Sequence, residues 1–265
     1  MSASAALRSA AAGAAQSASA PSALAARAGA ASRAIVHLRP AHADAAVKCV
    51  AASFASGAGK GAAARGELLD PFTLAFGFKK AAWSRMCGSF VARAAAAAAP
   101  LSAVAVRADG GDVDGLICCD DYTKQPPAIY RGLPAEWAPT RAIFRELYTR
   151  FDATPLAPRR AGSTAQCLYF SCVRPGARGA GVMKALWRHT IEAARDHGFE
   201  SIVCSAAHPD VQKKLHDIFG FEEVAAVAFQ EFAADTGLAA FAKLPPAGYQ
   251  KLALLRRKLP SDLYV

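Results

Sequence analysis

The stretch VRPGARGAGVMKAL, from Val173 to Leu186, decides the fold. It links an apolar run predicted as a strand (Cys167 to Val173) to an amphipathic helix predicted over Gly179 to His197. The link holds three glycines, although a glycine inside a helix costs roughly 0.5–1 kcal/mol. The first N–H groups of a helix lack partners and lie at the positive end of its dipole, so a strand, a glycine-rich turn and a helix aim backbone donors at a phosphate. The stretch therefore predicts a phosphate-bearing ligand.

Two common phosphate-binding patterns do not match this link. The dinucleotide-binding fingerprint requires GxGxxG, whereas the glycines here come in the reverse order, Gly176-x-x-Gly179-x-Gly181. A Walker A loop requires Lys followed by Ser or Thr after its last glycine, and Val182-Met183 stands in that place. Both nucleotide-binding loops are therefore disfavoured.

The link and a second segment resemble the signatures of one known family. RGAGVM (Arg178 to Met183), after a strand ending in VRP (Val173 to Pro175), resembles the acyl-CoA loop of the GNAT N-acetyltransferase superfamily. Met183 replaces the final small residue of that pattern. KKLHDIFGFEEV (Lys213 to Val224) resembles the second signature, Leu-Tyr-x-x-x-Gly-Phe followed by a strand. The spacing between the two segments suits a helix, a strand and a helix, and the order of elements upstream matches as well.

A narrower resemblance concerns the amine acceptor. VAVRADGGDVDGLICCDDY (Val104 to Tyr122) and FQEFAADTGLAAFAKLP (Phe229 to Pro245) look like segments of the arylalkylamine and dopamine acetyltransferase group. That group carries Glu-Pro-Leu where this chain has Asp70-Pro71-Phe72. The resemblance implies a small amine as acceptor.

The hydrophobic pattern predicts the fold class independently. After residue 34 the predicted order is β, α, α, β, β, α, β, α, β, α, β, β, which indicates a mixed sheet with helices in one α/β domain. The resemblance implies the GNAT fold, a mostly antiparallel twisted sheet of about six to seven strands with a V-shaped splay between two central parallel strands. The domain is expected over residues 35–257 and a C-terminal tail over 258–265.

The resemblance also implies acetyl-CoA as cosubstrate, with no metal. In the family, the amides of the loop hold the pyrophosphate of coenzyme A, and the preceding strand contacts the acyl carbonyl and the pantetheine arm. Basic side chains are expected to pair with the phosphates. The expected coenzyme-binding residues are Ser171, Cys172, Val173, Arg178, Gly179, Ala180, Gly181, Val182, Met183 and Lys213, with Lys214 as a further candidate.

Acyl transfer to an amine requires a base, and three carboxylates are candidates. Asp70 matches the acidic residue of the Glu-Pro-Leu motif and is expected to act through water, because an ordinary aspartate pKa of about 4 is far from that of an amine. The alternative is a helix N-cap directly before Pro71. Asp120 and Asp121, at the end of a predicted hairpin, are rival candidates for contacting a cationic acceptor, or else belong to a solvated turn.

The leaving thiolate requires a proton, and histidine stands where the family usually has a tyrosine. His216 follows Leu215 in the second signature, and an imidazolium titrates in the useful range. A surface histidine would give the same pattern, in which case water protonates the thiolate. Cys172 and Cys204 allow a covalent route, but buried strand cysteines are commoner, and the family transfers the acyl group directly.

The first 34 residues differ from the rest of the chain. They are rich in alanine and serine and carry arginines, and the first acidic residue of the protein is Asp44. This composition is typical of a transit peptide to a plastid or a mitochondrion. The alternative is an alanine-rich tail on a cytoplasmic protein. No run of about 18 strongly apolar residues predicts a membrane span.

Charge and cysteine content narrow the partners. Of the net charge of +10, four charges belong to arginines before Asp44, which leaves +6 with both signs interspersed. This mild excess suits a polyanionic small ligand and not the dense basic stripe of a nucleic-acid binder. The seven cysteines include no CxxC motif, which indicates reduced thiols and disfavours a zinc site.

Three functions remain open on the sequence. The leading hypothesis is direct acetyl transfer from acetyl-CoA to a small primary amine of the arylalkylamine or polyamine type, by a monomer or homodimer. A closed aromatic pocket with Phe72, Phe78 and Tyr130 would favour it. The second hypothesis is a protein N-terminus or lysine as acceptor, with Gln125 to Pro139 shaping an open groove. The third is a non-catalytic protein that binds acyl-CoA.

Overall fold

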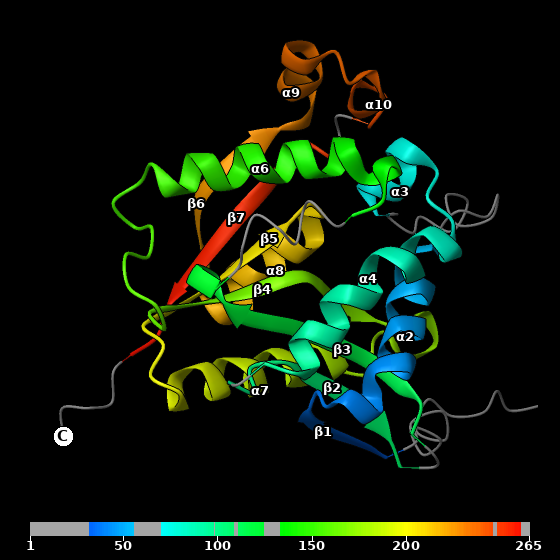
Figure 1. Cartoon of the computed structure of the whole chain (residues 1–265), viewed down its shortest axis with the longest axis vertical. Helices are drawn as coiled ribbons and strands as arrows, with labels where there is room; N and C mark the ends of the chain where they lie inside the picture. Colours follow the sequence, from blue (N-terminus) through cyan, green and yellow to red (C-terminus); the bar gives the residue numbers. More distant parts are fainter. Residues whose placement is uncertain are drawn as a thin grey trace, which may run out of the picture. The chain divides into compact units, whose positions relative to one another are not determined.

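A seven-stranded open sheet forms the centre of the described part of the chain (Figure 1). The computed structural model describes residues 32–55, 70–97, 99–108, 111–124, 133–245 and 248–260, without the side chains of 166–169. Nearly all of the predicted leader lies outside these residues, so the targeting prediction stays a prediction. The first strand begins at Arg33, two residues before the expected start of the domain.

The sheet is mixed and mostly antiparallel, as predicted. Its order is β1-β2-β3-β4-β5-β7-β6, and β4 with β5 is the one parallel pair among the described strands. The strands are β1 (Arg33–His37), β2 (Ala103–Arg107), β3 (Val113–Asp121), β4 (Thr164–Val173), β5 (Ser201–Ala206), β6 (Glu222–Ala228) and β7 (Lys251–Lys258).

The helices begin and end where the local sequence favours it. Asp70 caps a helix that starts at Pro71, and Gly77 and Gly220 end their helices in the left-handed conformation that glycine adopts without strain. The helices are α2 (Ala43–Ala55), α3 (Pro71–Phe76), α4 (Lys80–Ala95), α6 (Ala138–Asp152), α7 (Val182–Asp196), α8 (Pro209–Phe219), α9 (Phe229–Thr236) and α10 (Ala239–Ala242). The predicted order of elements lacks α9 and α10. None of the described helices is both long and apolar enough to cross a membrane.

The two parallel strands separate along their length. Pairing of β4 with β5 runs from Thr164 opposite Ser201 to Cys167 opposite Cys204 and then stops within the described residues. Beyond that point β4 remains paired with β3 as far as Val173, and β5 remains paired with β7. Each strand therefore keeps its outer neighbour while a V-shaped gap opens between them.

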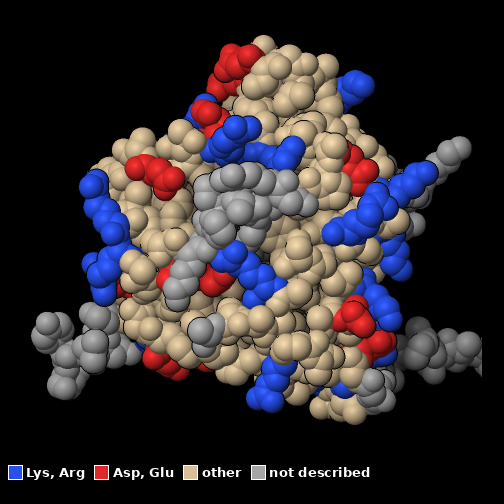
Figure 2. Space-filling view, in the orientation of Figure 1, with Lys and Arg blue, Asp and Glu red and all other residues tan. Residues whose placement is uncertain are grey.

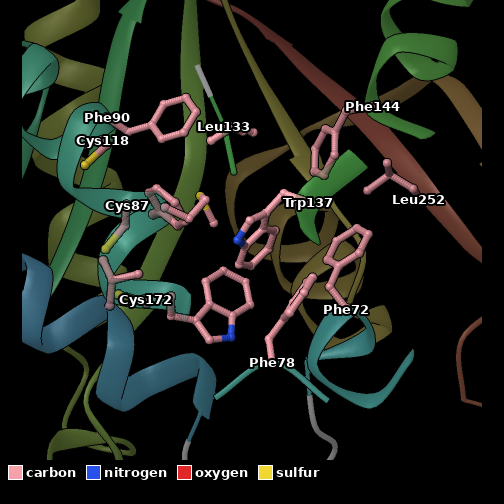
Figure 3. Packing of buried hydrophobic residues seen from close by; sticks show 14 of the residues in the cluster. Phe72, Phe78, Cys87, Phe90, Cys118, Leu133, Trp137, Phe144, Cys172 and Leu252 are labelled. Atoms are coloured by element: carbon pink, nitrogen blue, oxygen red, sulfur yellow. The ribbon is translucent and has the colours of Figure 1, made fainter. Parts of the chain in front are cut away.

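Two hydrophobic clusters pack against the sheet. One contains buried side chains from α2, α4 and α6, and the other contains side chains from α7 and α8. Figure 3 shows the first cluster, where Phe78 stacks on Trp137 with ring centroids 3.8 Å apart and Phe72 lies 5.6 Å from Phe144. Burial of each large apolar side chain is worth roughly 1.5–3 kcal/mol. The helices are thus fixed firmly on both sides of the sheet.

A glycine in β3 sets the approach of α7. A Cβ atom at Gly115 would lie 2.9 Å from the carbonyl oxygen of Cys172 and 3.1 Å from side-chain atoms of Val182 and Leu186. Real Cβ atoms do not tolerate such contacts, so only glycine allows the first turns of α7 to lie this close to the sheet. The N-terminus of α7 is thereby held next to the end of β4.

Candidate active site

A cavity of about 680 Å³ occupies the gap between the separated strands. This volume is in the range of small-molecule sites. On one side of the sheet it reaches Phe54, which packs against the cluster of α2 and α4, and on the other it reaches Met183 and Val211, which pack against the cluster of α7 and α8. The cavity therefore passes through the sheet and joins its two faces.

The glycine-rich link forms one end of this cavity. Gly179 and Gly181 have φ angles of +79° and +75°, which side chains rarely adopt, and a Cβ atom at either would meet nothing within 4 Å. The requirement for glycine here is thus conformational rather than steric. Five of the six predicted loop residues line the cavity, and Ala180 is the exception.

The first turn of α7 offers unpaired backbone donors to the cavity. The helix starts at Val182 after Gly181, which provides no side-chain cap, and the first bond within the helix comes from the N–H of Ala185 to the oxygen of Gly181. The N–H groups of Val182, Met183 and Lys184 therefore have no partner inside the helix. Together with the helix dipole they make this end of the cavity suitable for an anion.

The side chain of Arg178 ties the loop to its surroundings. Its Nε donates to the carbonyl oxygen of Val173 at 3.3 Å, and its Nη2 donates to that of Ser53 at 3.1 Å. The guanidinium is exposed and has five donors in all. Arg178 thus anchors the loop to β4 and α2 while lining the cavity, and its predicted contact with a phosphate stays a prediction.

One face of α8 lines the cavity. Val211, Lys214, Leu215 and Ile218 recur at steps of three and four residues, which place them on one side of the helix. Lys213, the predicted phosphate ligand, lies on another side and forms an ion pair with Asp217. The structure therefore brings Lys214 to the site and leaves Lys213 outside its described lining.

A second lysine at the site was missed by the sequence analysis. Lys184 lies in the first turn of α7 and lines the cavity together with Lys214 of α8. The family motif ends at Met183, one residue before Lys184. Its position in the first turn of the helix is the signal that could have identified it, because the N–H groups of that turn are unpaired like those of the loop.

Asp70 also lines the cavity and has two roles available. Its Oδ2 accepts a hydrogen bond from the N–H of Thr73 at 2.7 Å, so it is the N-cap of α3. It also lines the cavity next to Pro71. Burial raises the pKa of Asp70 to about 7, although the hydrogen bonds from Thr73 act in the other direction. The carboxyl is therefore a much better base near neutral pH than the expected ordinary aspartate.

The two rival carboxylates have structural partners. Asp120 accepts a hydrogen bond from Arg93 Nε at 2.8 Å, and Asp121 accepts one from the N–H of Gly162 at 2.9 Å. Both are buried, so the solvated turn suggested as an alternative is wrong. Neither is in the described lining of the cavity. They connect β3 to α4 and to the segment before β4.

The predicted acid, His216, lies on an exposed side of α8. Its Nδ1 is 3.0 Å from Oδ1 of Asp217, and it is outside the described lining of the cavity. His208 lines the cavity instead, at the start of α8, where its Nδ1 accepts a hydrogen bond from the N–H of Asp210 at 3.2 Å. The motif placed a histidine in the right helix, but not on the side that faces the cavity.

Two buried cysteines, Cys172 and Cys49, lie next to each other at the cavity. Burial raises the pKa of the Cys172 thiol well above its ordinary value, and its hydrogen bond to Cys49 acts in the same direction. That same hydrogen bond lowers the pKa of Cys49, whose side chain is buried behind the cavity wall. Cys172 is thus a poor nucleophile, which favours direct transfer over a covalent route.

The lining beside Asp70 includes apolar side chains. Ser53, Phe54 and Pro71 line the cavity beside Asp70. Phe54 is held by stacking on Trp83, with ring centroids 4.6 Å apart. Phe72 and Phe78, expected in an aromatic pocket, are buried in the hydrophobic cluster beside it. Tyr130, and the part of the expected groove before residue 133, lie outside the described residues.

Comparisons with known proteins agree with this geometry. Residues 159–221, which include the glycine-rich link and the whole of α8, match the model of the acetyltransferase (GNAT) family. A search among curated protein sequences found no match.

Three solved structures share the fold, each over 86% of this chain. The arylalkylamine N-acetyltransferase 2 of Aedes aegypti is 16% identical, is covered to 99% and has a TM-score of 0.65. The polyamine N-acetyltransferase of Drosophila melanogaster is 13% identical, is covered to 100% and has a TM-score of 0.60. The C-terminal condensation domain of Ebony, solved with beta-alanyl-dopamine, is 14% identical, is covered to 99% and has a TM-score of 0.69. Together with the family match these likenesses support transferase activity, and they confirm the resemblance of this chain to the GNAT N-acetyltransferases.

Proposed function

We propose that this protein is an N-acetyltransferase that moves the acetyl group of acetyl-CoA directly onto the primary amine of a small molecule. The observation that carries the proposal is the cavity through the sheet, which is lined both by the first turn of α7, with its unpaired N–H groups, and by Asp70. The cavity thus offers donors to an anionic coenzyme and a carboxyl group to a basic acceptor. They meet in the gap between β4 and β5.

At the coenzyme end, main-chain groups of the protein bind acetyl-CoA. The loop from Arg178 to Met183 and the first turn of α7 suit the diphosphate, because their donors need no side chain. Beyond Cys167 the edge of β4 that faces the gap has no strand partner among the described residues. Its free N–H groups, near Ser171 to Val173, are available to the pantetheine arm and to the acyl oxygen, where charge develops during transfer.

The amine end takes the proton and positions the acceptor. A carboxyl with a pKa of about 7 is half ionised at neutral pH, so Asp70 can accept a proton from the attacking amine, directly or through water. Phe54 and Pro71 give the same end an apolar wall. This combination favours an acceptor with an apolar body and one amine. Proteins with similar structures act on arylalkylamines and polyamines, and we propose that class here.

A panel of acceptors tests the proposal. The full chain is supplied with acetyl-CoA and with arylalkylamines, polyamines, N-terminal peptides or lysine peptides, and the released thiol is measured. Turnover with small amines above that with peptides is the expected result. A preference for peptides would replace the proposed acceptor class. Coenzyme A binding without turnover on any acceptor would contradict an enzymatic function.

The proposed compartment requires a separate test. We propose that residues 1–34 direct import into a plastid or mitochondrion. Fused to a fluorescent protein, these residues should carry it into the organelle, whereas a fusion with the three arginines of the segment replaced by aspartate should stay in the cytosol. Cytosolic fluorescence from the unaltered fusion would contradict the proposal.

A further inference from the structure

The hydroxyl of Thr73 joins three helices next to the cavity. Its Oγ1 accepts a hydrogen bond from Nε1 of Trp83 on α4 at 2.9 Å and donates one to the carbonyl oxygen of Phe54 at 3.2 Å. That carbonyl belongs to the last turn of α2, where carbonyl groups have no partner within the helix. Thr73 itself is buried in the first turn of α3. A single hydroxyl thus connects α2, α3 and α4 beside the lining residue Phe54.

The same threonine is bonded to Asp70 through two groups. Its N–H donates to Oδ2 of Asp70 at 2.7 Å and forms the helix cap. Its side chain is a second hydrogen-bond partner of the carboxyl. A hydroxyl has only one proton, and Trp83 already donates to its oxygen. The proton of Thr73 therefore has two acceptors to choose between, the carbonyl oxygen of Phe54 and the carboxyl of Asp70.

No described charged group sets the ionisation of Asp70. The ionisable side chains that share the cavity lining with it are Cys172, Arg178, Lys184, His208, Asp210 and Lys214. On the neighbouring helices α2 and α4, Asp44, Lys48, Lys80 and Arg85 are exposed, and Arg93 pairs with Asp120. None of these contributes to the shifted pKa of Asp70, which burial raises and which hydrogen bonds from Thr73 and from the N–H of Phe72 lower. Among the side chains, Thr73 is thus the one that favours the ionised form.

We propose that Thr73 is the positioning residue of the base, because its hydroxyl proton turns from the carbonyl oxygen of Phe54 to the carboxylate when Asp70 ionises. The role rests on the proposed function, in which Asp70 accepts the amine proton. A hydrogen bond to a charged acceptor is roughly twice as strong as a neutral one, so the turned proton stabilises the carboxylate. When the amine proton arrives, the hydroxyl turns back to Phe54 and Asp70 passes the proton to solvent. Thr73 keeps its own proton throughout.

The wild type alone tests the turning of the hydroxyl. In protein labelled with ¹³C at the carboxyl and carbonyl carbons of aspartate and phenylalanine, the titrating signal that disappears in Asp70→Asn belongs to Asp70. The carbonyl carbon of Phe54 should shift with the same midpoint, because it loses the hydroxyl proton as Asp70 ionises. That shift should be absent in Asp70→Asn. A Phe54 carbonyl signal that stays constant through the titration of Asp70 would overturn the proposal.

Substitutions of Thr73 test its effect on the carboxyl. Thr73→Val removes the hydroxyl but keeps the N–H of the cap, so the acid should become about tenfold weaker and the pKa of Asp70 should rise by about one. Thr73→Ser keeps a hydroxyl and should restore the wild-type pKa. The matched control is Thr164→Val, since Thr164 is also buried and bonds to the hydroxyl of Ser201 at 2.8 Å, but lies outside the described lining. An unchanged pKa in Thr73→Val, or an equal rise in Thr164→Val, would overturn the proposal.

The pH dependence of turnover gives a further readout. In Thr73→Val the rise of kcat should move upward by about one pH unit, with little change in the KM for acetyl-CoA, and Thr73→Ser should follow the wild type. A loss of kcat of the same size at every pH would mean a packing role and would contradict the proposal. If the wild type acetylates no amine, the proposed function fails, whereas the carbon titrations still decide whether Thr73 controls the ionisation of Asp70.

Discussion

The two ends of the cavity are built from different parts of the chain. The coenzyme end consists of backbone atoms from one continuous stretch, the link from Val173 to the first turn of α7. The amine end consists of side chains from α2, from the N-cap of α3 and from α3 itself, such as Phe54, Asp70 and Pro71, which come from two separate segments of the chain. The coenzyme end is therefore encoded by one short stretch of sequence, whereas the amine end is assembled only when separate segments come together on folding.

This difference explains why the coenzyme end tolerates substitution. Backbone donors do not depend on the side chain that carries them, so Met183 stands in the loop without disturbing the helix N-terminus. At the amine end each contact needs a particular side chain. Figure 2 shows lysines, arginines and acidic side chains interspersed on the face it displays. Substitutions at the two ends should accordingly fail in different ways.

The largest effect is expected where the backbone itself must change. Replacing both Gly179 and Gly181 by valine forces β-branched residues into φ angles near +77°, at a cost of roughly 1–3 kcal/mol each, or shifts the loop. Either outcome removes the aligned donors, so binding of coenzyme A should be abolished in calorimetry, while circular dichroism should show the fold largely intact.

The matched control for this change is Gly198→Val. Gly198 has a φ of +77° and open space around its missing Cβ, as the loop glycines have, but it follows the other end of α7. This variant should lose comparable stability yet bind coenzyme A normally. Unchanged coenzyme affinity in the loop variant would count decisively against the loop as the diphosphate site.

The next effect concerns the amine end alone. Asp70→Asn should lower kcat by about 100-fold, in the range that a general base contributes, and leave the KM for acetyl-CoA unchanged. Asparagine caps helices as well as aspartate does, so α3 should keep its cap. Steady-state kinetics together with thermal melting separate the two roles. A large drop in melting temperature with proportionate loss of coenzyme binding would assign Asp70 to structure.

The raised pKa of Asp70 predicts opposite pH trends for activity and stability. Its pKa is about 7 in the folded state, against 3.8 for an unperturbed aspartate, so the folded protein holds this proton more tightly. Stability contributed by the neutral carboxyl is fully present below about pH 4 and is lost as the pH rises through 7. Activity should rise over the same upper range. In Asp70→Asn the rise of activity with pH should disappear. The difference in unfolding free energy between this variant and the wild type should be largest above pH 7, where Asp70 is ionised, and should shrink as the pH falls.

The sequence predicted the fold far better than the side of each helix that faces the site. Apolar periodicity predicted the order of the strands and of the longer helices, and the family resemblance predicted the splay. The structure confirms both. The short helices α9 and α10 were missed because their apolar residues continue into neighbouring segments without a clear period. On α8 the signature located the helix, but successive residues point about 100° apart. Which of Lys213 and Lys214 meets the ligand depends on packing against the sheet.

Smaller effects should depend on which side of α8 faces the cavity. Lys184→Ala and Lys214→Ala should each raise the KM for acetyl-CoA by about three- to tenfold, because both lysines line the cavity and exposed charge contacts are modest. Lys213→Ala removes a lysine of the same helix that is paired with Asp217, and its KM should stay at the wild-type value. The effect in the first two variants should weaken at high salt. Equal effects of Lys213→Ala and Lys214→Ala would show that only net charge matters.

The smallest effect is expected at His216, which the sequence predicted as the acid for the leaving thiolate. His216 lies on the side of α8 away from the described lining and contacts Asp217, so His216→Ala should change kcat by less than about twofold. The pH dependence of kcat should also stay the same, because no proton passes through this imidazole. His208→Ala on the cavity side serves as the comparison, and a larger loss there is expected. A large loss in His216→Ala alone would show that α8 turns when the coenzyme binds, and the site would then include the proton donor to the leaving thiolate that the sequence motif identified.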